Sequence, residues 1–474
     1  MRATLWLRRA ALLPAQFAVY GILPNLLLVL CTLGLSAPRA WVNVDLLAFG
    51  IVALFLPSAL AIAGFALLMS LELATDIAPI FHFDPVSFLM TSEDVGNLSL
   101  SLDMLPPSIW LGFPLGLAGL VFCLWHVERA ARLRAAIALA AAIVLVVSLD
   151  AANGTSRLNG RFFHVDRSFA QANFAFSPLV RIALEIPSYL DYRDGRQQWG
   201  HVDSALAHGV ALAPHAGSAP RGNIALVLVE SWGTMTSAPG TDDYILKPLL
   251  SPALLARYKV VRGAIPYSGS TTSAELRELC NASGSYRMLQ PGHVPDCWPA
   301  RLAQQGYRVV AIHGFWSTMF DRFAWWPQIG LSHALFMGDR GWKPPARRCG
   351  TSFRGICDAD AVAELGNQLR KGSNVFAYLL TLNSHLPVAR RPPRGSSLDC
   401  ARAPVLLTAR QCAIAARWRI VFDSVAGLAG RDDIGQTTFI LVGDHPPPFF
   451  HWGDTAVFSH SNVPFIILTP HGPS

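Results

Sequence analysis

The sequence predicts a chain in two parts, a bundle of membrane helices followed by an α/β domain. Two observations lead to this prediction. The first 152 residues contain four long apolar stretches, whereas the rest of the chain has none of that length. From Gly222 onward, short apolar runs rich in Val, Ile and Leu alternate with helix-like segments up to the C-terminus. This alternation is typical of the α/β class.

The four apolar stretches predict the membrane part. They run from Phe17 to Ala37, Val44 to Leu71, Ile109 to Trp125 and Ala135 to Leu149. Each is long enough, or nearly so, to cross a hydrocarbon core of about 30 Å at a rise of about 1.5 Å per residue. We expect four to five helices, because the segment from Trp41 to Leu73 is broken by Pro57 and has room for a short helical pair.

Composition supports this division and sets the domain limits. The chain has 474 residues, 52% hydrophobic and 15% charged, with a mean hydropathy of +0.36. That is too apolar for an ordinary soluble enzyme and too long for one ordinary domain. We predict a transmembrane helical domain over 1–152, a connector on the membrane surface over 153–221, and an extracytoplasmic catalytic domain over 222–474. The net charge of +7 comes from scattered Arg residues without a basic block, so no nucleic-acid partner is expected.

Arginine placement predicts the orientation in the membrane. The loop from His126 to Arg134 contains three Arg residues, and short basic loops stay in the cytoplasm. The helix after this loop then leads outward, which places the rest of the chain outside. Arg2, Arg8 and Arg9 precede the first apolar stretch, as in a cleaved signal peptide. A retained anchor is favoured, because that stretch is long and further apolar stretches follow.

Six cysteines of the second part support an oxidising compartment. Six cysteines allow fifteen pairings, and three local loops form the simplest set. These loops would join Cys280 to Cys297, Cys349 to Cys357 and Cys400 to Cys412. Zinc knuckles use Cys-x-x-Cys, which none of these spacings matches, so disulfides are preferred.

Polar residues adjoin five short apolar runs of the α/β part. Ile224 to Val229 ends at Glu230, Val309 to Ile312 at His313, Val375 to Leu382 near His385, and Thr437 to Val442 at Gly443-Asp444-His445, while Pro464 to Leu468 follows His460. Sheets of this class bind ligands at the carboxyl ends of their strands. We therefore expect Glu230, Asp444 and His445 to meet, and their oxygen and imidazole donors suit a divalent cation. The plain alternatives are a helix N-cap and a turn.

A second polar segment precedes a helix-like stretch. It reads Tyr267-Ser268-Gly269-Ser270-Thr271-Thr272-Ser273-Ala274-Glu275. A hydroxyl at a helix N-terminus lies near backbone amides that stabilise an oxyanion or a phosphate, and a metal can activate it as a nucleophile. The alternative is a capping loop rich in Ser and Thr.

The order Glu230, Thr271, His385, Asp444-His445, His460 resembles the alkaline phosphatase and sulfatase superfamily. It is most similar to the membrane-anchored branch with lipoteichoic acid synthases and lipid A phosphoethanolamine transferases. The matching stretches are Asn223 to Ser231, Gly269 to Glu275, Asn383 to Pro387 and Gly443 to His445. The resemblance implies an N-terminal transmembrane helix bundle followed by an alkaline phosphatase/sulfatase-like α/β/α sandwich domain.

The resemblance also implies roles for individual residues. Glu230, Asp444 and His445 would bind one divalent metal ion, zinc in preference to manganese, and Thr271 would be both a ligand and the catalytic nucleophile. His385 would be catalytic, by contacting the phosphate or protonating the leaving group, although a structural histidine is the alternative. The substrate-binding set would be Arg322, Phe320, His385 and His460. Phe320 stands where the lipoteichoic acid synthases have Trp, which leaves the specificity for the sugar alcohol open.

The function implied is a metal-dependent transferase. It would move phosphoethanolamine or phosphoglycerol from a phospholipid donor to an envelope glycan or lipid acceptor through a phosphothreonine. Such a protein is embedded in the bacterial inner (cytoplasmic) membrane as a multi-pass protein, with its catalytic domain in the periplasm. A phosphodiesterase or sulfatase-like hydrolase and a non-catalytic accessory protein of polysaccharide assembly are the alternatives. The formylglycine-sulfatase motif, Cys or Ser followed by x-Pro-x-Arg, is absent around Thr271, which argues against a sulfatase of that kind.

Overall fold

A computed structural model describes two compact units, Met1–Arg193 and Asp194–Ser474. In the first unit the described residues are 12–33, 42–80, 107–127, 131–153, 175–177, 179, 183, 186 and 190. In the second they are 198–471 except 217–218, 268, 291, 352, 387, 406, 448, 450–453, 455–456 and 460. Most of the predicted connector, 153–221, lies outside the described residues.

The first unit is helical, as its apolar stretches predict. Its elements are the π-helix η1 (Ala18–Ile22), α2 (Leu23–Leu33), α3 (Val44–Ala53), α4 (Ser58–Ile80), α7 (Pro107–His126) and α8 (Arg132–Asn153), with a short parallel pair of β1 (Val42–Asn43) and β2 (Ala175–Phe176). Among the described residues, three helical stretches are long and apolar enough to span a membrane: Leu12–Cys31, Ile109–His126 and Arg132–Leu149. The short helical pair expected around Pro57 is present as α3 and α4, and the number of crossings stays a prediction.

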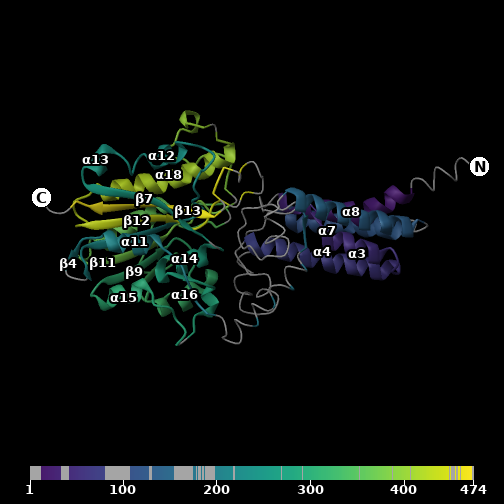
Figure 1. Ribbon diagram of the computed structural model, residues 1–474, viewed down its shortest axis with the longest axis horizontal. Coiled ribbons are helices and arrows are strands. Elements are labelled where there is room, and N and C mark those ends of the chain that lie inside the picture. The colour runs from purple at the N-terminus through teal and green to yellow at the C-terminus, as the bar shows by residue number, and fades with distance from the viewer. Residues whose placement is uncertain are drawn as a thin grey trace, which may run out of the picture. The chain divides into compact units, whose positions relative to one another are not determined.

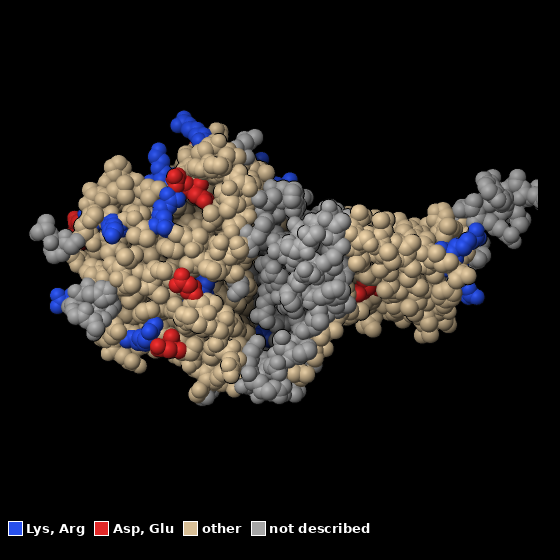
Figure 2. Space-filling model, viewed as in Figure 1, with Lys and Arg blue, Asp and Glu red and all other residues tan. Residues whose placement is uncertain are grey.

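The surface of this unit has the polarity expected of lipid-facing helices. Large apolar side chains are exposed, among them Leu67 at 73% and Leu115 at 72%. Figure 2 shows that the visible face of these helices is almost free of charged side chains, with the basic side chains of this unit, all Arg, at one end. Arg132 and Arg134 lie in the first turn of α8.

A buried polar group joins three helices of the same unit. Asn43, the N-cap of α3, is 2% exposed, and its side chain donates to the Glu72 carboxylate of α4. The backbone N–H of Asn43 donates to Asn25 Oδ1 of α2 at 2.6 Å. Buried polar groups cost free energy unless they are hydrogen-bonded, and these three residues provide partners for one another.

The second unit is built on a seven-stranded sheet in the order β10-β9-β11-β6-β12-β13-β7 (Figure 1). The strands are β6 (Asn223–Val229), β7 (Tyr258–Pro266), β9 (Arg308–His313), β10 (Ala334–Phe336), β11 (Val375–Leu380), β12 (Thr437–Gly443) and β13 (Asn462–Pro470). All five apolar runs read from the sequence are confirmed as strands. Strands β6, β11 and β12 are completely buried, as continuous apolar runs in a parallel sheet predict.

Most of the sheet is parallel, and one side is antiparallel. β6 pairs in parallel with β11 and β12, β9 pairs in parallel with β11 and β10, and β13 runs antiparallel to both β12 and β7. The start of β13 therefore lies at the same edge as the carboxyl ends of the parallel strands. Strands β7 and β10 were not predicted from the sequence, because most residues of β7 are exposed or half-buried and β10 is short.

Helices cover both faces of this sheet. They are α11 (Ala205–Leu212), α12 (Thr241–Leu246), α13 (Pro252–Leu255), α14 (Thr271–Cys280), α15 (Trp298–Gln304), α16 (Arg322–Trp325), α17 (Asp358–Leu369) and α18 (Ala409–Ala429). The β7 to β9 connection through α14 and α15 runs along the sheet in one direction, and the β10 to β11 and β11 to β12 connections through α17 and α18 run in the other. Right-handed crossovers then place these two sets on opposite faces, which gives the predicted α/β/α sandwich.

Two further features bear on the predicted domain limits and compartment. Helix α11 lies inside the predicted connector but belongs to the second unit, and a Cβ at its Gly209 would lie 2.2 Å from the Ile440 side chain of β12. The compact domain thus begins earlier than residue 222.

The disulfides Cys280–Cys297, Cys349–Cys357 and Cys400–Cys412 are all present, which confirms the three local pairs.

Candidate metal centre

Sheet topology brings the first two acidic residues together. β6 and β12 are parallel neighbours with Val229 opposite Gly443, so Glu230 and Asp444 follow directly at the carboxyl ends of adjacent strands. A Cβ on Gly443 would lie 1.9 Å from the carbonyl oxygen of Trp232. Glycine at this position therefore allows the two strand exits to approach each other closely.

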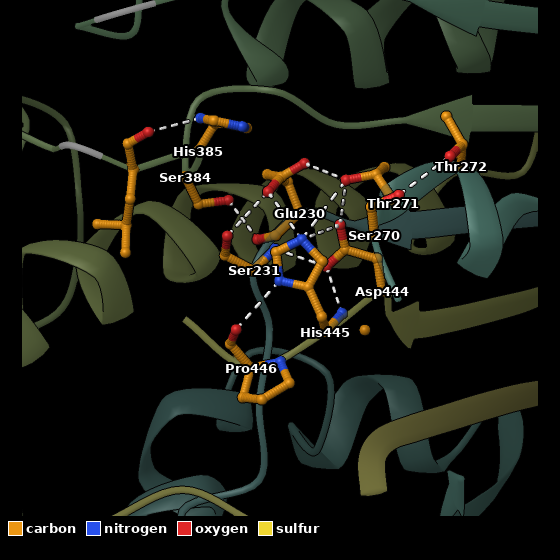
Figure 3. Close-up of polar contacts among 12 residues, drawn as sticks. Glu230, Ser231, Ser270, Thr271, Thr272, Ser384, His385, Asp444, His445 and Pro446 are labelled. Carbon is orange, nitrogen blue, oxygen red and sulfur yellow. Dashed lines mark hydrogen bonds and ion pairs between the residues drawn. The ribbon is translucent and has the colours of Figure 1, made fainter. Parts of the chain in front are cut away.

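Four side chains converge at this edge, as Figure 3 shows. Thr271 Oγ1 lies 3.3 Å from Glu230 Oε2, 3.0 Å from Asp444 Oδ2 and 3.5 Å from His445 Nε2. His445 Nε2 lies 3.3 Å from Asp444 Oδ2 and 3.7 Å from Glu230 Oε1. One donor atom from each of Glu230, Asp444 and His445 lies within 4.8 Å of the others, and all four residues are buried. The structure thus brings together the whole predicted ligand set.

Ser231 orients both carboxylates, a role that was not predicted from the sequence. Its backbone N–H donates to Asp444 Oδ1 at 2.7 Å, and its hydroxyl donates to Glu230 Oε1 at 2.8 Å. Asp444 Oδ1 accepts a second bond, from the backbone N–H of His445, at 2.7 Å. Ser231 has a φ of 53°, a left-handed conformation that costs a non-glycine residue about 1–2 kcal/mol. This conformation directs the backbone N–H of Ser231 toward Asp444 and its hydroxyl toward Glu230.

The tautomer of His445 suits a metal ligand. Its Nδ1 lies 3.0 Å from the carbonyl oxygen of Pro446. A carbonyl oxygen can only accept, so Nδ1 carries the proton and Nε2 presents its lone pair toward Thr271 and the acids. Metal-binding imidazoles are commonly held by such a bond from the other ring nitrogen.

The charge balance of the site favours a cation. Burial raises the pKa of Glu230 well above its ordinary value, and the negative charge of Asp444 raises it further. Two buried carboxylates with imidazole and hydroxyl partners form a donor set of oxygen and nitrogen that fits a divalent ion. The residues present therefore fit one zinc or manganese ion.

Thr271 is the first residue of α14, and Ser270 is its N-cap. The helix N-terminus adds a positive end of the dipole and backbone N–H groups beside the Thr271 hydroxyl. The neighbouring Thr272 is bonded differently, because its Oγ1 lies 3.0 Å from Ser270 Oγ. Figure 3 shows the contacts of Thr271 directed to the acids and the contact of Thr272 directed to Ser270.

His385 follows β11 at the same edge of the sheet. Its Nδ1 donates to the carbonyl oxygen of Leu386 at 2.6 Å, and its ring packs edge-on against Phe353 with centroids 4.4 Å apart. Burial and the nearby His445 lower the pKa of His385 to about 3. The lowered pKa favours a neutral ring at pH 7, in which Nδ1 carries the proton and Nε2 has the lone pair. The catalytic role of His385, by contacting the phosphate or protonating the leaving group, stays a prediction.

The loop that carries His385 is fixed by a buried acid. Asp358 accepts from the backbone N–H of Leu382 and of Asn383, each at 2.9 Å. Ser384 in this loop donates to the carbonyl oxygen of Glu230 at 2.6 Å. Burial raises the pKa of Asp358 to about 6. The loop is thus tied both to the start of α17 and to Glu230 at the end of β6.

Arg322 does not lie where its predicted role requires. It is 2% exposed and forms an ion pair with Glu275 at 2.8 Å, with a further bond from Nε at 3.1 Å. Phe320 is also buried, and the Arg322 guanidinium lies over its ring at 5.2 Å. In this structure both side chains are buried and the guanidinium is paired with an internal carboxylate, so substrate binding by Arg322 and Phe320 stays a prediction that this arrangement does not support. His460, the last predicted substrate-binding residue, lies outside the described residues.

Known proteins that are similar to this chain were found by comparison of structures and not by comparison of sequences. No protein-family model matches the sequence, and no curated protein is similar to it in sequence. The lipoteichoic acid synthase from Listeria monocytogenes is 14% identical over 60% of this chain and 72% of that chain, with a TM-score of 0.39. The phosphoglycerol transferase from Streptococcus pyogenes, in complex with sn-glycerol-1-phosphate, is 14% identical over 60% and 74%, with a TM-score of 0.39.

An integral membrane protein is also similar over most of its length. The lipooligosaccharide phosphoethanolamine transferase A from Neisseria meningitidis is 12% identical over 94% of this chain and 88% of that chain, with a TM-score of 0.40. Lipoteichoic acid synthases and phosphoethanolamine transferases are the two groups that the sequence motifs resemble.

Proposed function

We propose that this protein is a metal-dependent transferase in the inner membrane of a bacterium. It moves a phosphoethanolamine or phosphoglycerol headgroup from a phospholipid to an envelope glycan or lipid through a phosphothreonine at Thr271. The observation that carries the proposal is the position of Thr271 Oγ1 at a helix N-terminus, 3.0–3.5 Å from one donor atom of each of Glu230, Asp444 and His445. A hydroxyl among metal ligands is the arrangement of an activated nucleophile.

The metal would be held by Glu230, Thr271, Asp444 and His445, and we propose zinc because of the imidazole ligand. When bound, it would lower the pKa of the Thr271 hydroxyl and offset the repulsion of the two acids. The chain itself supplies the orientation. Ser231 holds one oxygen of each acid, so the other oxygen of each is directed at Thr271.

The reaction has two displacements at phosphorus. In the first, Thr271 Oγ1 bonds to phosphorus, the bond to the glycerol oxygen of the diacylglycerol breaks, and the hydroxyl proton leaves with the diacylglycerol. In the second, the acceptor oxygen bonds to phosphorus, the bond to Thr271 breaks, and the acceptor proton returns to Thr271. Dividing one displacement in this way lowers the barrier of each step. Membrane anchoring suits this reaction, since the donor and the first leaving group are lipids.

His385 suits the second displacement. Its Nδ1–H is held by the carbonyl oxygen of Leu386, and its pKa near 3 keeps the ring neutral. A neutral imidazole can accept a hydrogen bond through Nε2 from the acceptor hydroxyl and so orient it toward phosphorus. We therefore assign His385 the role of orienting the acceptor, since a group with so low a pKa is a weak base near pH 7.

The test is to trap the covalent intermediate on the full-length protein. The zinc-loaded protein in detergent would be mixed with phosphatidylethanolamine or phosphatidylglycerol, without acceptor, and digested for peptide mass analysis. One headgroup phosphate is expected on Thr271, and the donor that gives the adduct identifies the headgroup. Thr271→Ala should carry none.

Thr272→Ala is the matched control, because it removes the neighbouring hydroxyl that contacts Ser270. This variant should keep the adduct. An adduct on Thr272, or full transfer by Thr271→Ala, would reassign the nucleophile and contradict the proposal. Rapid release of free headgroup into water, with no transfer to cell-envelope glycans or lipids, would favour the hydrolase instead.

A further inference from the structure

A second residue of α14, the helix that begins with Thr271, contacts the segment at the end of β12 that carries Asp444 and His445. Arg277 of α14 is 4% exposed. Its Nη2 donates to the carbonyl oxygen of Gly443 at 2.8 Å, and its Nη1 donates to the carbonyl oxygen of Asp444 at 3.2 Å. One planar guanidinium thus holds two successive carbonyl oxygens at the end of β12, the segment that presents Asp444 and His445.

The guanidinium is itself fixed from the other side. Arg277 Nε donates to Glu278 Oε1 at 2.7 Å, and the Glu278 side chain is 0% exposed. Glu278 Oε2 accepts from the backbone N–H of Leu206 in α11 at 3.0 Å. The pair therefore connects three elements: the nucleophile helix α14, the start of α11 and the carboxyl end of β12. A guanidinium can hold several acceptors at once through its fixed fork of N–H donors, whereas a lysine ammonium is a single point charge.

The same helix carries a second buried ion pair that serves for comparison. Glu275 accepts from Arg322 and also from Trp326 Nε1 at 2.9 Å and Tyr378 OH at 3.2 Å. Its partners come from α16, from the residue after that helix and from β11. None of the hydrogen bonds recorded among the described residues connects this pair to Glu230, Asp444 or His445. Two buried ion pairs of similar chemistry thus differ in whether they contact the metal-binding segment.

We propose that Arg277 is a positioning residue that sets the Asp444–His445 ligand pair against Thr271 and thereby determines metal affinity. This inference rests on the proposed metal site. The distance between the nucleophile and two of its ligands depends on how α14 meets the end of β12, and Arg277 makes that connection through both carbonyl oxygens. Groups that hydrogen-bond to metal ligands without touching the metal commonly contribute about 10–100-fold to metal affinity.

The test compares two double variants of the full-length protein in detergent. Arg277→Met/Glu278→Gln removes the pair without leaving a lone buried charge, and the glutamine oxygen can still accept from Leu206. Arg322→Met/Glu275→Gln removes the other pair of α14 in the same way and is the matched control. Zinc affinity would be measured by competition with a chromogenic chelator, and the melting temperature would be measured without metal.

We expect zinc affinity to fall about 10–100-fold in the Arg277 double variant and less than threefold in the control. The visible spectrum of bound cobalt should also change in the first variant only, because it reports the geometry of the ligands. Arg277→Lys, which is conservative enough to fold if the double variant does not, should recover part of the affinity. This recovery distinguishes positioning from a general loss of stability.

Equal zinc affinity in the two double variants, or an unchanged cobalt spectrum in the Arg277 variant, would overturn the inference while the metal site stands. An unmodified chain that binds neither zinc nor cobalt would overturn the metal site and the inference together. The two failures are therefore distinguishable by the behaviour of the unmodified protein.

Discussion

Helix α14 borders two buried polar regions that differ in how their charge is balanced. The metal corner consists of Glu230, Asp444 and His445 around Thr271, and the aromatic corner consists of Glu275, Arg322, Trp326 and Tyr378 around the next turn. Burial raises the pKa of Glu230 and of Glu275 alike. The nearest charge then acts in opposite directions, because Asp444 raises the pKa of Glu230 further, whereas Arg322 lowers that of Glu275.

This difference separates a binding site from a structural ion pair. Glu275 is paired with a guanidinium from its own chain, so the aromatic corner is balanced by itself. In the metal corner the partners that contact the carboxylates are the Ser231 hydroxyl, backbone N–H groups, Thr271 and His445. Such a group is stabilised by a cation from outside. The predictions below test whether the two corners behave in these different ways.

The largest effect is expected for Asp444→Asn. The amide keeps an oxygen for the backbone N–H groups of Ser231 and His445, but it replaces the oxygen that faces Thr271 and removes a charge. Zinc affinity should fall by more than the roughly 10–100-fold typical of losing an indirect partner, and transfer should be lost. Metal content by elemental analysis checks this, with the exposed Asp432→Asn as the control. Wild-type zinc content in Asp444→Asn would contradict the assignment.

A second prediction concerns the aromatic corner. Arg322→Met leaves the Glu275 carboxylate buried without its partner, which should destabilise the second unit by about 3–5 kcal/mol. Zinc affinity of the folded fraction should stay within about threefold of the unmodified protein, since no hydrogen bond of this pair reaches a metal ligand among the described residues. Thermal unfolding and chelator competition measure the two effects. A large loss of zinc affinity with little loss of stability in Arg322→Met would show that the aromatic corner is part of the metal site.

The smallest effect is expected at Ser231, where hydroxyl and backbone contributions can be separated. Ser231→Ala and Ser231→Gly both lose the bond to Glu230, so both should weaken zinc binding by about 10–100-fold. Glycine also removes the strain of a φ of 53°, so Ser231→Gly should be more stable than Ser231→Ala by about 1 kcal/mol. Equal stability of the two variants would show that the left-handed conformation carries no cost.

The meeting of Glu230, Asp444 and His445 could be predicted because it depends on strand ends, whereas Thr271 was assigned through the family resemblance. Glu230 and Asp444 follow short apolar runs typical of buried strands, and the carboxyl ends of parallel strands share an edge. The cysteine pairs were accessible for a similar reason, since their short loops close most easily. The metal corner therefore needed no knowledge of side-chain contacts.

The aromatic corner could not be predicted in this way. Whether Arg322 meets a phosphate or Glu275 depends on packing between residues 47 positions apart, and no periodicity encodes that choice. Arg277 and Glu278 were missed because adjacent opposite charges in a helix usually lie on its surface. Ser231 gave no signal beyond its place after Glu230, since a left-handed serine has no sequence signature.

We propose that Thr271 and the three residues around it bind one metal ion. Anomalous X-ray scattering at the zinc absorption edge, on crystals of the zinc-loaded full-length protein, tests it most directly. We predict a single strong peak about 2.0–2.2 Å from oxygen atoms of Glu230, Asp444 and Thr271 and from His445 Nε2. A peak at other residues, or none here in a preparation that is active in transfer, would contradict the account.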